Sequence, residues 1–407
     1  MPGTLSAQSK MIKKDPKAIY YSALALYLLA KYAEISTIYY TSASVGLGMR
    51  YIRLLSYAMI AVYTVLYTRF TREEIVKYMA LISCVAIVSY TVHSVTLLAA
   101  FMFIFAAKDF DIYEVVRFVV VLQIITTIVI VAGCLAGIVP DWTYFISGRY
   151  RHSLGFFYPN RLSSIYFFIV IALFYLVGSG FNIIEIAGLE ILNFVIFYFT
   201  NSRMAFALTT LALILFLFIS VVDRMGMEIS FNRKVYICLL VIIPLICIAA
   251  CWIYKPSTMH LLSRINGLIS NRIQMGGAAL HTKPITLFGN INEWYGFGGL
   301  GYLYTQLAGE YNAVDCSFVK IFLDYGVLLW ALIIIGYAMA AAYAVDRGDK
   351  YLSIAILLVF VYCMIEPNLI EIGFNPFVLC LSALVSPNAF KGRSMADAKS
   401  ALLASYC

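Results

Sequence analysis

The chain reads GRYRHSLGFFYPNR at residues 148–161, between two long apolar runs at 117–138 and 161–179. Three arginines and a histidine stand here among small and turn-forming residues, at the mouth of the second run. An apolar run of roughly 20 residues is long enough to cross a bilayer as a helix. The stretch is therefore a charged connection between two membrane spans. Positive charge is costly at such a place, so its presence indicates a site for an anion.

The composition places the rest of the chain in a membrane as well. Of its 407 residues, 63% are hydrophobic and 12% are charged, whereas soluble domains carry about 25% charged residues. Backbone amides in lipid must find hydrogen bonds within their own segment, which favours helices. The short alternating segments of a membrane β-barrel do not occur in the sequence. We therefore expect an all-α polytopic integral membrane protein with about 12 transmembrane helices.

These spans are expected to form a single transmembrane domain, residues 1–407. The N-terminus is expected in the cytoplasm, with no cleaved signal, because lysines precede the first span: Lys10, Lys13, Lys14 and Lys17. The spans are expected at 18–40, 51–68, 78–92, 94–107, 117–138, 161–179, 183–200, 204–222, 235–254, 317–344, 351–365 and 369–386. Two pairs of consecutive spans are short for full spans: 78–92 with 94–107, and 351–365 with 369–386. Each pair is expected to form a tight helical hairpin or to include a re-entrant segment.

The positions of the lysines and arginines bear on this orientation. With the N-terminus inside, 17 of the 29 fall in cytoplasmic segments, Lys31 falls inside the first span, and 11 fall on the opposite side. Eleven is more than the positive-inside rule predicts. Nine of those 11 lie within 149–161, at 203 or within 255–320. The excess is local, and we interpret it as functional. The alternative is that one span is misplaced.

The longest connection, residues 255–316, lies between the ninth and tenth spans and is expected on the extracytoplasmic side. A loop of this length in a compact protein is usually a binding element or a lid. Its part 258–280 has helical periodicity. Arg264 and Arg272 are about two turns apart in it, so we expect both to face the same way.

Six arginines on the expected outer side are candidates for binding an anion. Guanidinium keeps its charge and binds phosphate oxygens through two parallel hydrogen bonds, so a cluster favours a lipid-linked phosphate or diphosphate. Arg203 lies between two apolar runs with almost no loop, where an ionisable residue is a functional candidate. The alternative for each is a side chain that snorkels to the interface. The six are Arg149, Arg151, Arg161, Arg203, Arg264 and Arg272.

Proton transfer requires a carboxylate or an imidazole. The acids on the expected outer side are Asp141, Glu293, Glu310, Asp315 and Glu366; His152 and His281 are alternative bases, and the sequence does not choose among them. Asp315 has an alternative role as the N-cap of the tenth span. Asn160 is expected to cap the sixth span, whose free amides would face the same anion. The cysteines and histidines show no metal-binding spacing, so no metal site is expected.

The pattern resembles the O-antigen and capsular polysaccharide polymerases (Wzy-type), within the superfamily that includes the O-antigen ligases. Each motif is short, but they occur in the family's order over most of the chain. They are Arg151-His152-Ser153-Leu154-Gly155-Phe156-Phe157-Tyr158-Pro159-Asn160, Asn201-Ser202-Arg203, Ser270-Asn271-Arg272 with Pro284 and Leu287-Phe288-Gly289, Asp315-Cys316-Ser317-Phe318 with Asp324-Tyr325-Gly326, and Glu366 with Asn375-Pro376.

The resemblance implies a GT-C-like glycosyltransferase, multi-pass in the bacterial inner (plasma) membrane, that uses no metal or other cofactor. Such an enzyme transfers a growing glycan from undecaprenyl diphosphate to a new lipid-linked repeat unit of O-antigen, capsule or exopolysaccharide. A chain-length regulator and a flippase are expected partners, and nucleic acid is not.

Residue by residue, the resemblance makes Asp315, Arg272 and Arg203 the catalytic candidates. Arg151, Arg203 and Arg272 would bind the diphosphate, joined by Arg264, Arg161 and Asn160. Aromatic side chains of the long loop would stack on sugars, although aromatic residues are also ordinary at membrane interfaces: Trp294, Tyr295, Tyr302, Tyr304 and Tyr311.

Two departures from the family pattern bear on these assignments. Ligases carry a His-Asn pair where this chain has Asp315-Cys316, which favours a polymerase. Cys316 also replaces the Asn of the polymerases. The alternatives are a ligase, a flippase or exporter of lipid-linked oligosaccharide, and a non-catalytic assembly partner. A flippase would line its path with charges at mid-membrane depth, whereas these charges gather at one face.

Overall fold

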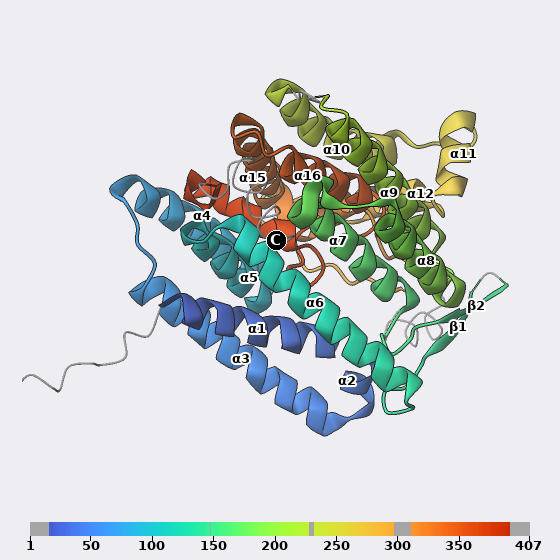
Figure 1. The fold of residues 1–407 in the computed structure, drawn as a ribbon, viewed down its shortest axis with the longest axis horizontal. Coiled ribbons are helices and arrows are strands. Elements are labelled where there is room, and N and C mark those ends of the chain that lie inside the picture. Colours follow the sequence, from blue (N-terminus) through green and yellow to red (C-terminus); the bar gives the residue numbers. More distant parts are fainter. Residues whose placement is uncertain (1–15, 147, 228–231, 297–310, 391–407) are drawn as a thin grey trace, which may run out of the picture.

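The computed structural model describes residues 16–146, 148–227, 232–296 and 311–390, and these are mostly helical (Figure 1). The N-terminal lysines 10, 13 and 14, as well as Tyr302, Tyr304 and Glu310, lie outside the described residues. The helices are α1 (Pro16–Glu34), α2 (Thr37–Thr41), α3 (Ala43–Leu66), α4 (Arg72–Thr91), α5 (Val95–Ala106), α6 (Ile112–Leu135), α7 (Pro159–Val177), α8 (Ile183–Thr200), α9 (Arg203–Arg224), α10 (Arg233–Ile253), α11 (His260–Leu268), α12 (Arg272–Thr282), α14 (Ser317–Asp324), α15 (Gly326–Asp346) and α16 (Lys350–Cys363).

The described residues contain eight helices long and apolar enough to cross a membrane: α3, α4, α6, α7, α8, α9, α10 and α15. The structure is therefore that of a largely helical membrane protein, and the expected count of twelve spans is not confirmed. The expected spans 94–107 and 351–365 are helices of 12 and 14 residues, α5 and α16. Both are shorter than the roughly 20 residues that a span requires.

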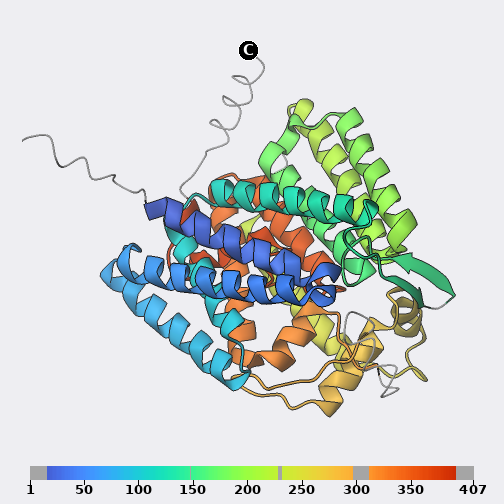
Figure 2. The same ribbon diagram turned by 90° about the horizontal axis from the view of Figure 1, so that it is seen from below.

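Helix α7 is the centre of the bundle. In its apolar window 78% of the residues are buried, against 17% for α3 and α6. It packs against α6, α8, α9 and α16, and Figure 2 shows the bundle from below. Phe174 of α7 stacks on Phe216 of α9 with the ring centroids 3.7 Å apart, and Phe167 stacks on Tyr362 of α16 at 3.9 Å. The N-terminus of α7 is thereby fixed, and the charged stretch that precedes it is fixed with it.

The expected span 369–386 is wrong. It contains a 3-10 helix, η3 (Pro376–Leu384), after an irregular segment. Pro376 disfavours α-helical geometry in the residue before it and has no N–H to donate. The buried irregular backbone is satisfied by side chains instead. Gln123 Nε2 donates to the carbonyls of Gly373 and Phe374 at 3.0 and 2.9 Å, and Tyr337 Oη donates to that of Leu369 at 2.9 Å.

The expected tenth span, 317–344, is broken in two at Tyr325. Gly326 has a φ of +83°, and a Cβ on it would lie 2.4 Å from the backbone nitrogen of Gly289. The segment before Gly289 docks on this break, because Val327 N donates to Thr286 O at 3.0 Å. Only glycine allows both the conformation and the approach. The long connection is thus tied to the bundle at this point.

A two-stranded hairpin, which the all-helical expectation missed, lies between α6 and α7. Its strands are β1 (Thr143–Ile146) and β2 (Arg149–His152), paired antiparallel. The segment after it is held against the end of α1, since Thr37 N donates to Gly155 O at 2.9 Å and Phe157 N donates to Ile35 O at 3.0 Å. The stretch 148–161 is therefore built into the bundle on both sides.

Candidate functional site

The candidate site lies at the end of the bundle that carries the hairpin (Figure 1). Six parts of the chain meet there: β2, the start of α7, the junction of α8 and α9, the start of α12, the residues just before α14, and the residues just after α16. Most of the sequence-predicted residues are in these parts. The hydrogen bonds between them decide which belong to one site.

Arg151 lies at the centre of one half of the site and is 7% exposed. Its strand position pairs it with Tyr144, on the buried face of the hairpin. Its Nε donates to the carbonyl of Thr200 at 2.8 Å, and its Nη2 donates to Asn160 Oδ1 at 2.5 Å and to Ser202 Oγ at 3.1 Å. The hairpin, α7 and the junction of α8 with α9 are thereby joined by a single guanidinium.

Two further arginines surround Arg151. Asn201 ends α8 in the left-handed conformation with a φ of +49°, and Arg149 Nη1 donates to its Oδ1 at 3.1 Å. Burial lowers the pKa of Arg149, and the charges of Arg203 and Arg151 lower it further. Within the described residues, no carboxylate forms a salt bridge with any of the three. This group, which we call the arginine half, is an uncompensated concentration of positive charge.

The other half of the site consists of one arginine shared by two acids. Arg272 begins α12 and is 8% exposed. Its Nη2 lies 3.0 Å from Glu366 Oε1 and 3.4 Å from Asp315 Oδ2. Its Nε is buried and has no hydrogen-bond partner among the described residues. We call these three residues the acid half.

Asn160 connects the two halves. Its Oδ1 accepts from Arg151 and from Ser202 Oγ, the latter at 3.0 Å, while its Nδ2 donates to Glu366 Oε1 at 3.1 Å. A continuous chain of hydrogen bonds therefore runs from Arg151 through Asn160 to Glu366 and on to Arg272. A change of charge in one half therefore alters the electrostatic potential in the other, because the connection is short and largely buried.

Glu366 is held where its protonation can change near neutrality. Burial raises its pKa to about 7; the positive charge of Arg272 opposes the rise and the negative charge of Asp315 adds to it. Burial likewise raises the pKa of Asp315, against the attraction of Arg272. The backbone carbonyl of Glu366 accepts from Ser317 Oγ at 2.6 Å, which fixes the start of α14 against it.

The structure corrects three expectations about single residues. Arg264 and Arg272 do not face the same way: Ser270 and Asn271 both have a positive φ, which ends the helical phase, and Arg264 is exposed on α11. The N-cap of α7 is Tyr158, so Asn160 lies inside the first turn. The N-cap of α14 is Cys316, which leaves Asp315 to pair with Arg272.

The remaining candidates lie at the edge of the site or away from it. His152 Nδ1 lies 2.6 Å from Asp141 Oδ2, and Asp141 Oδ1 accepts from Leu154 N at 2.8 Å, so this pair closes the base of the hairpin. His281 Nε2 lies 3.2 Å from the carbonyl of Trp252. The guanidinium carbon of Arg161 lies over the rings of Phe157 and Phe374, 4.9 and 5.4 Å from their centroids.

Two residues of the site were not among the site residues expected from the resemblance. Arg149 was a candidate only as one charge among six, and its link to Asn201 depends on the left-handed end of α8. Ser202 Oγ bridges Arg151 and Asn160. The sequence carried a hint of both interactions: the polar pair Asn201-Ser202, which accepts from Arg149 and Arg151, stands between two apolar runs directly before Arg203.

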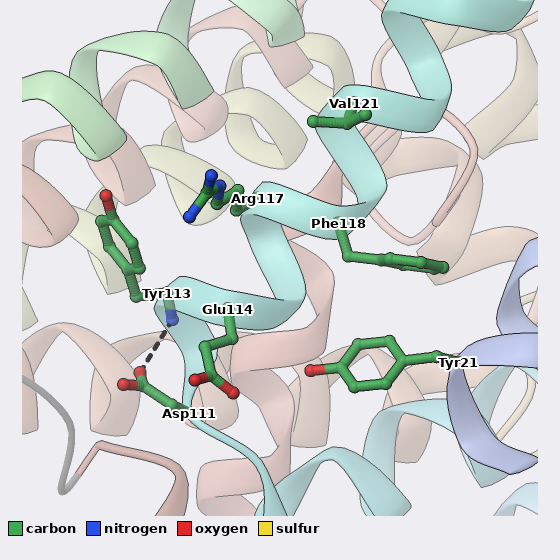
Figure 3. Close-up of a pocket in the computed structure, with 7 residues that line it drawn as sticks. All are labelled: Tyr21, Asp111, Tyr113, Glu114, Arg117, Phe118 and Val121. Atoms are coloured by element: carbon green, nitrogen blue, oxygen red, sulfur yellow. Dashed lines mark hydrogen bonds between the residues drawn. The ribbon is translucent and has the colours of Figure 1, made fainter. Parts of the chain in front are cut away.

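A cavity of about 630 Å³ lies at the other end of α6, around its N-terminus (Figure 3). Asp111 and Glu114 line it, with Tyr21 on the opposite wall. Asp111 Oδ1 accepts from Tyr113 N at 2.9 Å and caps the helix, and negative charge is favourable at a helix N-terminus. The acids here have a structural explanation, and none of the sequence-predicted site residues lines this cavity.

Comparisons of the chain with protein-family models, with curated proteins and with solved structures found no match.

Proposed function

We propose that this chain is a membrane glycosyltransferase that polymerises lipid-linked oligosaccharide repeat units. It would transfer the growing glycan from undecaprenyl diphosphate onto a new lipid-linked repeat unit, in the bacterial plasma membrane. One observation supports this above the others. The arginine half, which forms no salt bridge with a carboxylate of the described residues, stands next to a buried glutamate whose pKa is raised to about 7, and Asn160 joins the two.

The arginine half is suited to the donor diphosphate. Arg203 is exposed, and Arg149 is half-buried beside it, so a ligand can reach both. Guanidinium groups that are already in place stabilise negative charge as it develops on a leaving group. In this proposal Arg149 and Arg203 bind the diphosphate oxygens, and Arg151 positions them from behind. Arg272 holds the acids rather than the phosphate, because two carboxylates already compensate its charge.

The acid half is suited to activating the acceptor. In the proposed reaction the hydroxyl oxygen of the acceptor sugar attacks the anomeric carbon of the donor glycan. The bond from that carbon to the diphosphate oxygen breaks, and undecaprenyl diphosphate leaves with the bonding electrons. The hydroxyl proton passes to Glu366, whose raised pKa makes the carboxylate a stronger base than a solvated one. Asp315, on the same arginine, orients the acceptor.

The test is an in vitro reaction of the purified protein in lipid with its undecaprenyl-diphosphate-linked repeat unit as the sole substrate. We expect a ladder of products that differ by one repeat unit. Arg203→Ala should reduce the rate by about 10²-fold or more, the usual effect of removing one preorganised donor. Arg117→Ala is the matched control: Arg117 is also exposed, but it lies on α6 outside the site and should leave the ladder unchanged.

Other results would assign another activity. Transfer of a finished glycan to an acceptor that is not a repeat unit, with no ladder, would identify a ligase. Movement of the lipid-linked substrate across the bilayer without any new glycosidic bond would identify a transporter. A full ladder from Arg203→Ala would remove the arginine half from the mechanism.

A further inference from the structure

A second cavity, of about 240 Å³, lies beside the acid half. Its wall is formed by the ends of α1 and α2, the start of α7, α14 and the segment after α16. The residues that matter here are Lys31, Tyr40, Phe157, Arg161, Asn368 and Glu371. The volume is below the roughly 300–1,000 Å³ of pockets that hold drug-sized ligands. It suits a single ring rather than a chain of them.

Two residues of the cavity wall carry buried polar atoms that have no hydrogen-bond partner among the described residues. Asn368 is 1% exposed, and neither its Nδ2 nor its Oδ1 has a hydrogen-bond partner among the described residues. The Nε of Arg161 is also buried without a partner. A buried amide without partners is costly, and such a group in a native structure calls for an explanation such as a ligand that is absent from the protein chain.

The kinds of atom left unpaired identify the chemistry of the ligand. Asn368 Nδ2 and Arg161 Nε are donors, whereas Asn368 Oδ1 is an acceptor. A phosphate or another anion offers acceptors only, and it would leave Oδ1 unsatisfied. A sugar hydroxyl both donates and accepts, so neighbouring hydroxyls of one ring can satisfy all three atoms.

The other walls also fit a sugar. Most charged side chains of the wall are paired. Lys31 Nζ lies 3.0 Å from Glu371 Oε2, and the two other charged residues of the wall besides Arg161 also have partners: Glu34 pairs with Arg53 at 3.3 Å and Lys320 pairs with Asp324 at 3.0 Å. On the other side Tyr40 lies edge to face with Phe157, with the ring centroids 6.1 Å apart. The paired charged side chains can form hydrogen bonds with the hydroxyls of a sugar. The aromatic rings can pack against the C–H face of the sugar ring.

The cavity adjoins Glu366, the base of the proposed reaction. Asn160 contacts Glu366, and the next residue, Arg161, lines the cavity. Asn368, two residues after Glu366, also lines the cavity, and its N donates to the backbone carbonyl of Glu366 at 3.0 Å. Glu366 is thus connected both to Asn160, which contacts the arginine half, and to the wall of the cavity.

We propose that this cavity binds the terminal sugar of the acceptor repeat unit, through Asn368 and Arg161, with Tyr40 and Phe157 as its aromatic wall. The assignment to the acceptor rests on the proposed function. The recognition of an uncharged sugar ring rests on the cavity alone, and it can be measured without any turnover.

The experiment measures binding to the purified full-length protein with two soluble probes. The first is the oligosaccharide freed by mild acid from the host's lipid-linked oligosaccharides, and the second is inorganic diphosphate. We expect Asn368→Leu to weaken oligosaccharide binding about ten- to hundredfold, because two hydrogen bonds are lost, and to leave diphosphate binding unchanged. Arg203→Ala should weaken diphosphate binding and leave oligosaccharide binding unchanged. Asn388→Leu, a like change at a half-buried asparagine outside the cavity, should alter neither.

Folding is not an obstacle to this test. Leucine has the same branched arrangement of heavy atoms as asparagine, although a larger volume, and the side chain of Asn368 has no hydrogen bond to lose among the described residues. We therefore expect Asn368→Leu to fold, and its melting temperature checks this. Tyr40→Ala serves as a second variant, because its side chain is 38% exposed, and it should also weaken oligosaccharide binding. Unchanged oligosaccharide binding in both variants would overturn the proposal.

Two further outcomes have definite meanings. If Asn368→Leu weakens diphosphate binding, or if diphosphate displaces the oligosaccharide competitively, the cavity takes an anion and the sugar assignment is wrong. If the oligosaccharide binds through Asn368 but no ladder forms in the polymerisation assay, the sugar site stands and the proposed polymerase activity fails.

Discussion

Glu366 and Asp315 share one guanidinium, that of Arg272, in a largely buried place. Burial raises the pKa of Glu366 to about 7, so Glu366 is mostly protonated below that pH and mostly ionised above it. Only the ionised form can accept the acceptor's proton. We therefore expect the polymerisation rate to rise with pH through about 7, and Glu366→Gln to lower it by about 10²- to 10⁴-fold.

The measurement is the rate of ladder formation over a range of pH on both sides of 7, at saturating substrate. Glu366→Gln should lose the inflection along with the activity, since glutamine does not titrate. A wild-type profile that is flat through this range, or an inflection that persists in the residual activity of Glu366→Gln, would assign the base to another residue.

Arg203 and Arg272 are both catalytic candidates from the resemblance, but their replacement should change the stability of the protein by different amounts. Arg203 is exposed, so Arg203→Ala should change the free energy of unfolding by no more than about 0.5 kcal/mol. Arg272→Ala leaves the two acids without their shared partner and should cost about 3–5 kcal/mol. Thermal unfolding in one detergent compares them. Glu366→Gln added to Arg272→Ala should restore part of the loss; no restoration would show that the acids do not depend on Arg272.

At the scale of elements, the break between α14 and α15 decides where Asp315 lies, because it sets how the chain enters the bundle. Gly326→Ala adds a Cβ at a φ of +83° and 2.4 Å from the backbone nitrogen of Gly289. We expect it to destabilise the protein by more than the roughly 1–3 kcal/mol of backbone strain alone.

A matched control separates strain from close approach. Gly348 has a similar φ of +72°, but a Cβ on it would have no atom within 4 Å. Gly348→Ala therefore carries the strain without the clash, and its melting temperature should lie between those of the wild type and Gly326→Ala. Equal losses in the two variants would mean that the docking of residues 284–289 on this break contributes nothing.

The helices show how much of the fold can be predicted from the sequence. Apolar runs with no breaker, such as those of α8 and α9, predict helices with nearly their observed bounds, because membrane burial requires satisfied backbone amides. The run 369–386 is also apolar but contains no α-helix. Its carbonyls at Leu369, Gly373 and Phe374 accept hydrogen bonds from Tyr337 and Gln123. These donors are remote in sequence, and no local pattern predicts them.

The same limit applies to the site. Charge is rare in this chain, so residue type and position were enough to make Arg151, Arg272 and Glu366 candidates. Their pairing was not predictable, since Asn160 and Glu366 are 206 residues apart and Arg272 and Glu366 are 94 apart. The error on Arg264 has a local cause. Two residues with positive φ, Ser270 and Asn271, end a periodicity that otherwise reads as one helix.

At the scale of the whole molecule, the acid-lined cavity lies at the N-terminal end of α6 (Figure 3), and the hairpin of the candidate site follows its C-terminal end (Figure 1). A helix of 24 residues is about 36 Å long, enough to cross the hydrocarbon core. With α6 across a membrane, its two ends would face different compartments. The proposed reaction requires the site to face outward, where lipid-linked repeat units are polymerised.

Single cysteines introduced in place of exposed residues test this orientation, with the native cysteines replaced by serine. Tyr150→Cys lies in the hairpin, where Tyr150 is 72% exposed, and it should react with a membrane-impermeant maleimide in intact cells. Glu185→Cys is exposed at the start of α8, the far end of the helix from Asn201, and it should react only after permeabilisation. Reversed labelling would place the arginine half in the cytoplasm. The arginine half would then bind the donor diphosphate on the cytoplasmic side, before the lipid-linked substrate crosses the membrane. A polymerase on the outer face would be ruled out.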